Sequence, residues 1–208
     1  MLDKNVILIG YSGQGHVVAE VVLENQWNIV GYAEKEQLQY NPYNLNYIGY
    51  ENNHNFFSNN NNQIEYVIGI GDNYIREKVF NSIIDNNKKP LTLVSPSSII
   101  SNSVKMGNGV FVNKNVIINA LVTIGANVIL NTACIIEHGC VIGDSAHIST
   151  GAVLAGNVTI GKRSFIGANS VIKQGVVIGE DVIVGAGTVV LSNVPSQKTI
   201  VGNPGHFI

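Results

Sequence analysis

Large apolar residues recur at every sixth position through the second half of the chain. The register holds without a slip at Ile100, Met106, Val112, Ile118, Ile124, Leu130, Ile136, Ile142, Ile148, Leu154, Ile160, Ile166, Ile172, Ile178, Val184 and Val190. A smaller residue follows four positions after each of them. A six-residue period matches neither a helix nor a single strand, and it is typical of a triangular β-helix whose interior takes one aliphatic side chain per side.

Three hexads close one coil of the predicted left-handed parallel β-helix. At about 4.8 Å per coil, the spacing of hydrogen-bonded strands, the prism should be about 25 Å tall. The residue after the aliphatic is often glycine, as at Gly107, Gly125 and Gly143, and we assign these glycines to the tight corner conformation. No hexad is interrupted, so any further binding surface must come from the residues that precede the repeat.

The first ninety or so residues alternate strand and helix patterns. The expected strands are 5–9, 27–32, 65–70 and a closing strand at 91–94, and the expected helices are 17–24 and 74–84. This order predicts an α/β, Rossmann-like βαβ domain over residues 1–96. An all-β β-helix over 97–195 and a C-terminal tail over 196–208 follow it.

Composition and charge narrow the function. The net charge of −2 excludes a polyanion-binding surface, so no nucleic-acid partner is expected. The N-terminus lacks a secretory pattern and no apolar run reaches membrane-spanning length, so we expect a cytoplasmic protein without a membrane partner. Cys134 and Cys140 stand one hexad apart at inward positions, where we interpret them as small core residues.

Several motifs spread along the chain resemble one family. They are Gly10-Tyr11-Ser12-Gly13-Gln14-Gly15-His16, Ile70-Gly71-Asp72-Asn73 with Arg76, Asn131 before Ile136-Glu137-His138, and Val201-Gly202-Asn203-Pro204-Gly205. Together with the hexads, they are similar to the bacterial sugar acetyltransferases of pilin glycosylation, the perosamine N-acetyltransferases and their sialic-acid O-acetyltransferase relatives. The resemblance implies a homotrimer, with acetyl-CoA bound between neighbouring β-helices. It also implies a nucleotide-linked amino sugar as the acceptor, held by the N-terminal domain, in surface glycan biosynthesis.

His138 is the candidate general base. It is the third residue of its hexad, which puts it near a corner and pointing outward. The resemblance implies that its imidazole takes a proton from the acceptor amine as the amine attacks the thioester. In many relatives an acidic residue follows the histidine, but Gly139 stands there. Glu137 is the candidate to orient the imidazole, with a backbone carbonyl or another carboxylate as alternatives.

The resemblance assigns four more residues to acetyl-CoA. Gly156, one coil beyond His138, would hydrogen-bond the acetyl carbonyl through its N–H, and His147 would lie beside the acetyl group. Ala168 and Ala186 would contact the coenzyme along its groove. Each also has a plain structural interpretation, as a corner glycine or a small repeat residue.

The nucleotide sugar is assigned to the first domain and to one residue of the repeat. Gly10, Ser12, Gly13, Gly15 and His16 form a loop between a strand and a helix that would hold the diphosphate. Their G-x-x-G-x-G spacing differs from the G-x-G-x-x-G of dinucleotide folds, which argues against a redox enzyme. Glu34 and Lys35 are assigned to the nucleobase, and Asn131 is assigned to the acceptor pocket. The pocket wall is assigned to Asp72, Asn73 and Arg76. Asp72 or Asn73 could equally cap a helix.

Alternatives remain on the same scaffold. The preferred acceptor is a 4-amino-4,6-dideoxy sugar, and O-acetylation of a sugar or sialic acid is the second choice. A zinc carbonic anhydrase needs three histidine ligands, whereas only His138 and His147 lie in the repeat, so no metal is expected. A purely structural or ice-binding β-helix would show flat threonine-rich arrays, which the sequence lacks.

Overall fold

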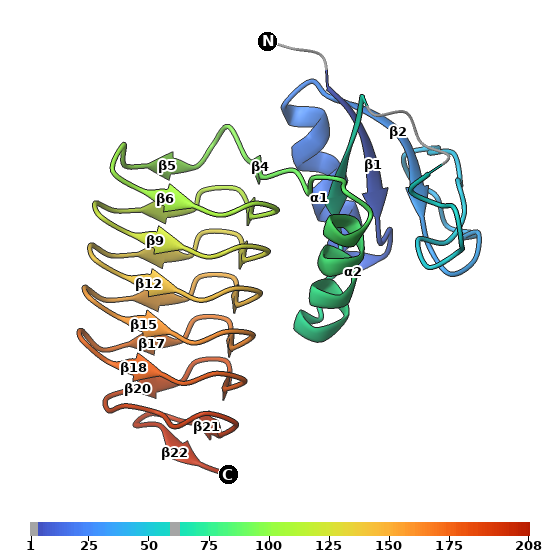
Figure 1. Ribbon diagram of the computed structural model, residues 1–208. Helices are drawn as coiled ribbons and strands as arrows, with labels where there is room; N and C mark the ends of the chain where they lie inside the picture. The colour runs from blue at the N-terminus through green and yellow to red at the C-terminus, as the bar shows by residue number, and fades with distance from the viewer. Residues whose placement is uncertain (1–3, 59–62) are drawn as a thin grey trace. The chain divides into compact units, whose positions relative to one another are not determined.

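The computed structural model describes residues 4–58 and 63–208. The chain divides into two compact units, Met1–Leu93 and Val94–Ile208, and each is described by itself (Figure 1).

The first unit is a parallel βαβ arrangement, as the sequence predicts. β1 (Asn5–Ile9) is the central strand, with β2 (Asn28–Ala33) on one side and β3 (Ile64–Ile68) on the other. α1 (Gly13–Glu24) connects β1 to β2, and α2 (Asn73–Asp85) follows β3. Residues 6–9 of β1 are wholly buried, which explains why this strand is a continuous apolar run.

Two predicted elements differ from the structure. α1 begins at Gly13 rather than Val17, so the second half of the glycine loop forms the first turn of the helix. The predicted closing strand at 91–94 is wrong. Pro90 makes only an isolated bridge to Tyr66, and β4 (Leu93–Val94) pairs instead with the first full coil of the β-helix.

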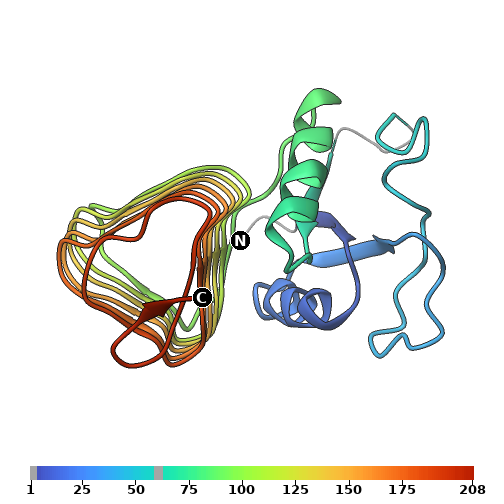
Figure 2. The ribbon, with the colours of Figure 1, turned by 90° about the horizontal axis from the view of Figure 1, so that it is seen from below.

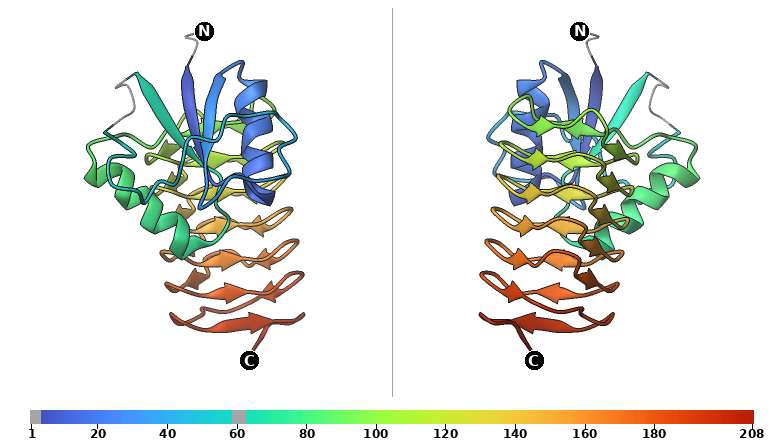
Figure 3. Two further views of the ribbon diagram at one scale, coloured as in Figure 1. Left: turned by 90° about the vertical axis from the view of Figure 1, so that its right-hand side faces the viewer. Right: turned by 90° about the vertical axis from the view of Figure 1, so that its left-hand side faces the viewer.

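The second unit stacks short strands into three faces of a triangular prism, seen end-on in Figure 2 and from two sides in Figure 3. Face 1 comprises β4, β7 (Phe111–Val112), β10 (Ile129–Leu130), β13 (His147–Ile148), β16 (Phe165–Ile166), β19 (Ile183–Val184), β21 (Thr199–Val201) and β22 (His206–Phe207). Face 2 comprises β5 (Ile99–Ile100), β8 (Ile117–Ile118), β11 (Ile135–Ile136), β14 (Val153–Leu154), β17 (Val171–Ile172) and β20 (Val189–Val190). Face 3 comprises β6 (Lys105–Met106), β9 (Thr123–Ile124), β12 (Val141–Ile142), β15 (Thr159–Ile160) and β18 (Val177–Ile178).

The strand register repeats every third hexad, which confirms the predicted coil. Ile129 pairs with His147, and His147 pairs in turn with Phe165. The hexad aliphatics form one continuous buried cluster, and Cys134 and Cys140 lie in it with no exposed surface. Burial raises the pKa of the Cys134 thiol to about 12. Beyond residue 195, β21 extends face 1 in parallel and β22 folds back on it antiparallel.

The glycines after the aliphatics have a different cause from the predicted one. Positive φ angles fall instead three residues after every hexad aliphatic from Met106 to Val184, for example at Asn127 (58°) and Gly139 (69°). Gly107 and Gly143 are not among the positive-φ residues, but a Cβ on either would lie 2.7 Å from a backbone nitrogen of the next coil. Close stacking of coils, rather than corner conformation, therefore requires these glycines.

Candidate active site

The His138 imidazole packs directly on the glycine of the next coil. His138 is exposed at the corner between faces 2 and 3, and its carbonyl accepts a hydrogen bond from the Asn157 N–H at 2.8 Å. A Cβ built on Gly156 would lie 2.6 Å from both Nε2 and Cε1 of the imidazole. Only glycine at position 156 therefore leaves room for the ring where it stands.

Glu137 does not reach the imidazole. In the described part of the chain its carboxylate makes no hydrogen bond or ion pair with His138. Burial raises the pKa of the Cys140 thiol, and the charge of Glu137 adds to that rise, so the carboxylate acts on Cys140. Gly139 has a left-handed backbone, and a Cβ there would meet the Asn157 side chain. These two constraints explain why glycine, and not an acidic residue, follows the histidine.

Asn131 and His147 form a second polar cluster. The Asn131 amide nitrogen lies 3.3 Å from His147 Nε2, and the Asn131 carbonyl oxygen accepts from the Asn113 amide at 2.9 Å. Because the amide nitrogen faces Nε2, that ring nitrogen accepts and the proton lies on Nδ1. The imidazole also meets the edge of Phe165, with ring centroids 5.0 Å apart.

The predicted acetyl-CoA residues separate into two corners of the prism. His138 and Gly156 follow β11 and β14, at the corner between faces 2 and 3. Ala168 and Ala186 follow β16 and β19, at the corner between faces 1 and 2, as Asn131 does. The fold of one chain therefore does not bring the two groups to a common point.

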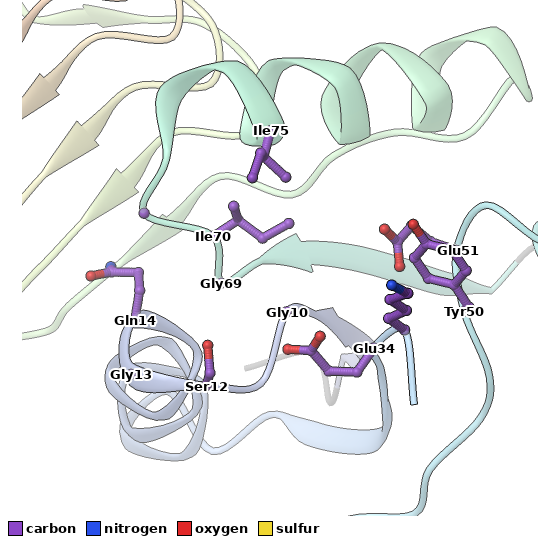
Figure 4. Close-up of a pocket in the computed structure, with 12 residues that line it drawn as sticks. Gly10, Ser12, Gly13, Gln14, Glu34, Tyr50, Glu51, Gly69, Ile70 and Ile75 are labelled. Atoms are coloured by element: carbon purple, nitrogen blue, oxygen red, sulfur yellow. The ribbon is translucent and has the colours of Figure 1, made fainter. Parts of the chain in front are cut away.

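The first unit contains a cavity of about 520 Å³ at the carboxyl ends of its strands (Figure 4). Five residues assigned to the nucleotide sugar line it: Gly10, Ser12, Gly13, Glu34 and Lys35. The rest of the lining had no predicted binding role, although three of its residues stand in the quoted motifs: Gln14, Tyr50, Glu51, Gly69, Ile70, Gly71 and Ile75. The carboxyl edge of a parallel sheet is where such folds bind ligands.

One end of the cavity is the N-terminus of α1. The first hydrogen bond inside the helix runs from His16 N–H to the Ser12 carbonyl at 2.9 Å, so the three preceding N–H groups have no acceptor within the helix. The Ser12 side chain makes no capping hydrogen bond. This end can hold an anion such as a phosphate.

Two carboxyl groups also line the cavity. Glu34 accepts a hydrogen bond from the Tyr11 N–H at 2.7 Å through one oxygen. Glu51 is 8% exposed. Burial raises the pKa of Glu51, its own N–H opposes the rise, and the charge of Glu34 adds to it. The two groups therefore repel one another in their ionised forms.

Gly15 and His16 serve packing instead of lining the cavity. A Cβ on Gly15 would meet the Gly10 carbonyl, and a Cβ on Gly69 would lie 2.6 Å from Gly15 Cα, so the helix start is packed tightly on two loops. The His16 imidazole meets Tyr11 edge-on at 5.0 Å and Tyr40 at 5.7 Å between ring centroids.

The residues predicted to form the pocket wall at α2 do not line the cavity but hold a neighbouring loop in place. Asp72 caps the helix by accepting from the Ile75 N–H at 2.8 Å. Arg76 is 1% exposed and donates to the Gly71 carbonyl and to the Asn73 side chain, both at 2.9 Å. Burial lowers the pKa of Arg76 to about 10. Asp72, Asn73 and Arg76 thus fix the loop whose Gly71 lines the cavity.

Comparisons with known proteins agree with this architecture. A model described as the PglD N-terminal domain matches residues 5–83, and one described as a hexapeptide repeat of succinyl-transferase matches residues 157–192. The acetyltransferase domain of PglB from Neisseria gonorrhoeae is 28% identical, with a TM-score of 0.93 over 99% of this chain and 100% of that one. PerB from Caulobacter crescentus, in complex with CoA and GDP-perosamine, is also 28% identical, with a TM-score of 0.89 over 100% and 98% of the two chains. A search of curated proteins finds no match.

A hexad-built β-helix that presents an outward histidine, preceded by a βαβ unit with a glycine loop, defines a hexapeptide-repeat acyltransferase. More narrowly, the chain belongs to the PglD-like family of sugar N-acetyltransferases.

Two further findings concern metals and membranes. Within residues 4–58 and 63–208 no three His, Cys, Asp or Glu side chains gather closely enough to hold a metal ion. Neither α1 nor α2 has the length and apolar character to cross a bilayer, and no other helix is present among these residues.

Proposed function

We propose that this enzyme transfers the acetyl group of acetyl-CoA to the amino group of a nucleotide-linked sugar. The observation that carries the proposal is a cavity with a helix N-terminus at one end, on the same chain as a β-helix with an exposed histidine. The PglB acetyltransferase domain has been solved in complex with acetyl coenzyme A, and PerB with CoA and GDP-perosamine. By analogy, the acceptor is a 4-amino-4,6-dideoxy sugar destined for a surface glycan.

His138 is the proposed general base. The sugar amine attacks the thioester carbonyl, a C–N bond forms, and the imidazole takes the proton that the nitrogen loses. The C–S bond then breaks, and the imidazolium returns its proton to the departing sulfur, which gives free CoA. In the described structure the imidazole packs against the backbone of Gly156.

Gly156 is the proposed donor to the developing oxyanion. Its N–H finds no acceptor among the described residues, whereas the next residue, Asn157, donates to His138. An unpaired N–H beside the base suits an acetyl carbonyl whose oxygen gains negative charge in the transition state.

A homotrimer would complete the site. The outward positions of face 2 form an unbroken apolar stripe: Ile99, Ile117, Ile135, Val153, Val171 and Val189. Burying such a stripe between copies of the β-helix is favourable. It would also bring the corner with His138 and Gly156 toward the corner with Asn131, Ala168 and Ala186 of a neighbour, which one chain cannot do. His147 would then lie beside the bound acetyl group.

The test is a thiol-release assay with acetyl-CoA and UDP-, dTDP- and GDP-linked 4-amino sugars, with the 4-hydroxy counterparts in parallel. We expect release with amino acceptors, and His138→Ala to lower turnover about a hundredfold, a usual general-base contribution. His54→Ala, which removes a histidine of the first unit, is the matched control. Gel filtration checks that His138→Ala stays trimeric. Near-normal turnover in that variant would exclude the general base, and release only with hydroxy sugars would make the enzyme an O-acetyltransferase.

A further inference from the structure

The Glu51 carboxyl lies in the cavity, away from the N-terminus of α1. Figure 4 shows the Glu51 carboxyl on the side of the cavity away from Ser12 and Gln14, with the Glu34 carboxyl between Glu51 and Ser12. Glu51 is more than nine-tenths buried, and in residues 4–58 and 63–208 its carboxyl has no partner other than its own N–H. A buried carboxyl that faces a cavity without a partner is costly unless a ligand supplies hydrogen bonds.

The chemistry of a carboxylate limits what can bind there. An ionised carboxylate only accepts hydrogen bonds, so its ligand must present N–H or O–H groups. Glu34 is the first residue after β2, the place where an acidic side chain of such folds accepts from ribose hydroxyls. One of its oxygens already accepts a hydrogen bond from the Tyr11 N–H. Glu51 is then left for the nucleobase.

The common nucleobases differ in the hydrogen-bond donors that they present to a carboxylate. Guanine presents two adjacent donors, N1–H and the N2 amino group, which match the two oxygens of one carboxylate. Uracil and thymine present a single N–H between two carbonyl oxygens, so a carboxylate that accepts from it meets at least one like-charged oxygen. Ile70, Ile75 and Tyr50 supply apolar and aromatic surface in the same cavity for the faces of a ring.

We propose that Glu51 reads the donor edge of guanine, and that the nucleotide sugar of this enzyme is GDP-linked. The inference rests on the proposed function, because it assumes that the cavity holds the nucleotide of the acceptor. It adds Glu51 as the residue that selects the base, a role that its position in a loop hides from sequence patterns.

The test is equilibrium titration calorimetry of the full chain with GDP, UDP and dTDP at pH 8, because alkaline pH favours the ionised form of the Glu51 carboxyl. We expect GDP to bind about tenfold or more tightly than the other two, in the range of a bidentate carboxylate–base contact. Glu51→Gln keeps the size of the side chain but replaces one acceptor with a donor, so it should abolish most of this preference. Glu36→Gln removes the same charge from an exposed neighbour that does not line the cavity, and it should change nothing.

The outcomes separate the two proposals. Equal or stronger binding of UDP or dTDP, or an undiminished GDP preference in Glu51→Gln, would overturn the assignment of the base and leave the acetyltransferase intact. Failure of all three diphosphates to bind would overturn both the base assignment and the placement of the acceptor nucleotide. Rescue of UDP binding in Glu51→Gln, with circular dichroism unchanged, would support the assignment most directly, because a merely structural role predicts uniform loss.

Discussion

Replacing Gly156 with alanine isolates the placement of the His138 imidazole from its chemistry. The added Cβ would lie 2.6 Å from Nε2, whereas ordinary contacts begin at 3.4 Å, so the ring must move by at least about 0.8 Å. A displacement of this size in a reacting group costs on the order of a hundredfold in rate. Gly156 is not among the positive-φ residues and His138 is exposed, so the ring can swing into solvent and the fold should lose little stability.

The assay is steady-state acetyl transfer on the single variants and on Gly156→Ala/His138→Ala. If Gly156→Ala acts only through the ring, the double variant should be no slower than His138→Ala, which is strong non-additivity. Gly175→Ala is the control, because Gly175 lies in the next coil and its new Cβ has no atom within 4 Å. Any loss in this variant comes from alanine at a positive φ and not from contact with an imidazole. Full activity of Gly156→Ala, or independent losses that multiply in the double variant, would refute the assigned role of the contact.

Three further predictions concern stability and reactivity. Burial raises the pKa of Glu51, so the folded protein binds that proton more tightly than the unfolded chain. The stability of the fold should therefore fall as pH rises above the ordinary pKa of 4.5. Glu51→Gln should raise the melting temperature at pH 8 but not at pH 4. Thermal melting that shows the same benefit at both pH values would contradict this. Gly15→Ala, which meets a backbone carbonyl, should unfold the first unit or cost more than about 2 kcal/mol in chemical denaturation, whereas Gly13→Ala, with nothing within 4 Å, should gain up to about 1 kcal/mol of helix propensity. Equal effects of the two would contradict the packing argument. Cys134 and Cys140 should react with a thiol reagent only in denaturant, and rapid labelling of the native protein would show that the core opens readily.

The β-helix could be predicted almost completely because its periodicity is dictated by one local rule. Each inward aliphatic repeats the same contact with its equivalent in the next coil, so the six-residue period of the sequence identifies the core residues directly. The reason for the glycines could not be read in the same way. Gly107 and Gly143 are set by the distance to a coil three hexads away, which no local pattern expresses.

The cavity could be predicted only in part, for a related reason. Gly10, Ser12 and Glu34 follow strands of the first unit, so the topology itself brings them to one edge. Gly15 carries the same glycine signature, but its packing contact across the helix start is visible only in three dimensions. Glu51 lies in a loop without periodicity, and a lone loop glutamate carries no signal of its burial.

The central location of β12 has a consequence for motion. It is the middle strand of the five described on face 3, and every coil is held only by the coils directly above and below it. In such a linear stack, opening starts at the ends and must pass through each coil in turn. His138, which lies at the corner just before this strand, therefore belongs to the part of the β-helix that should unfold last. Amide hydrogen exchange should slow from both ends toward it, and the His138 imidazole should keep its place even while the outer coils open locally.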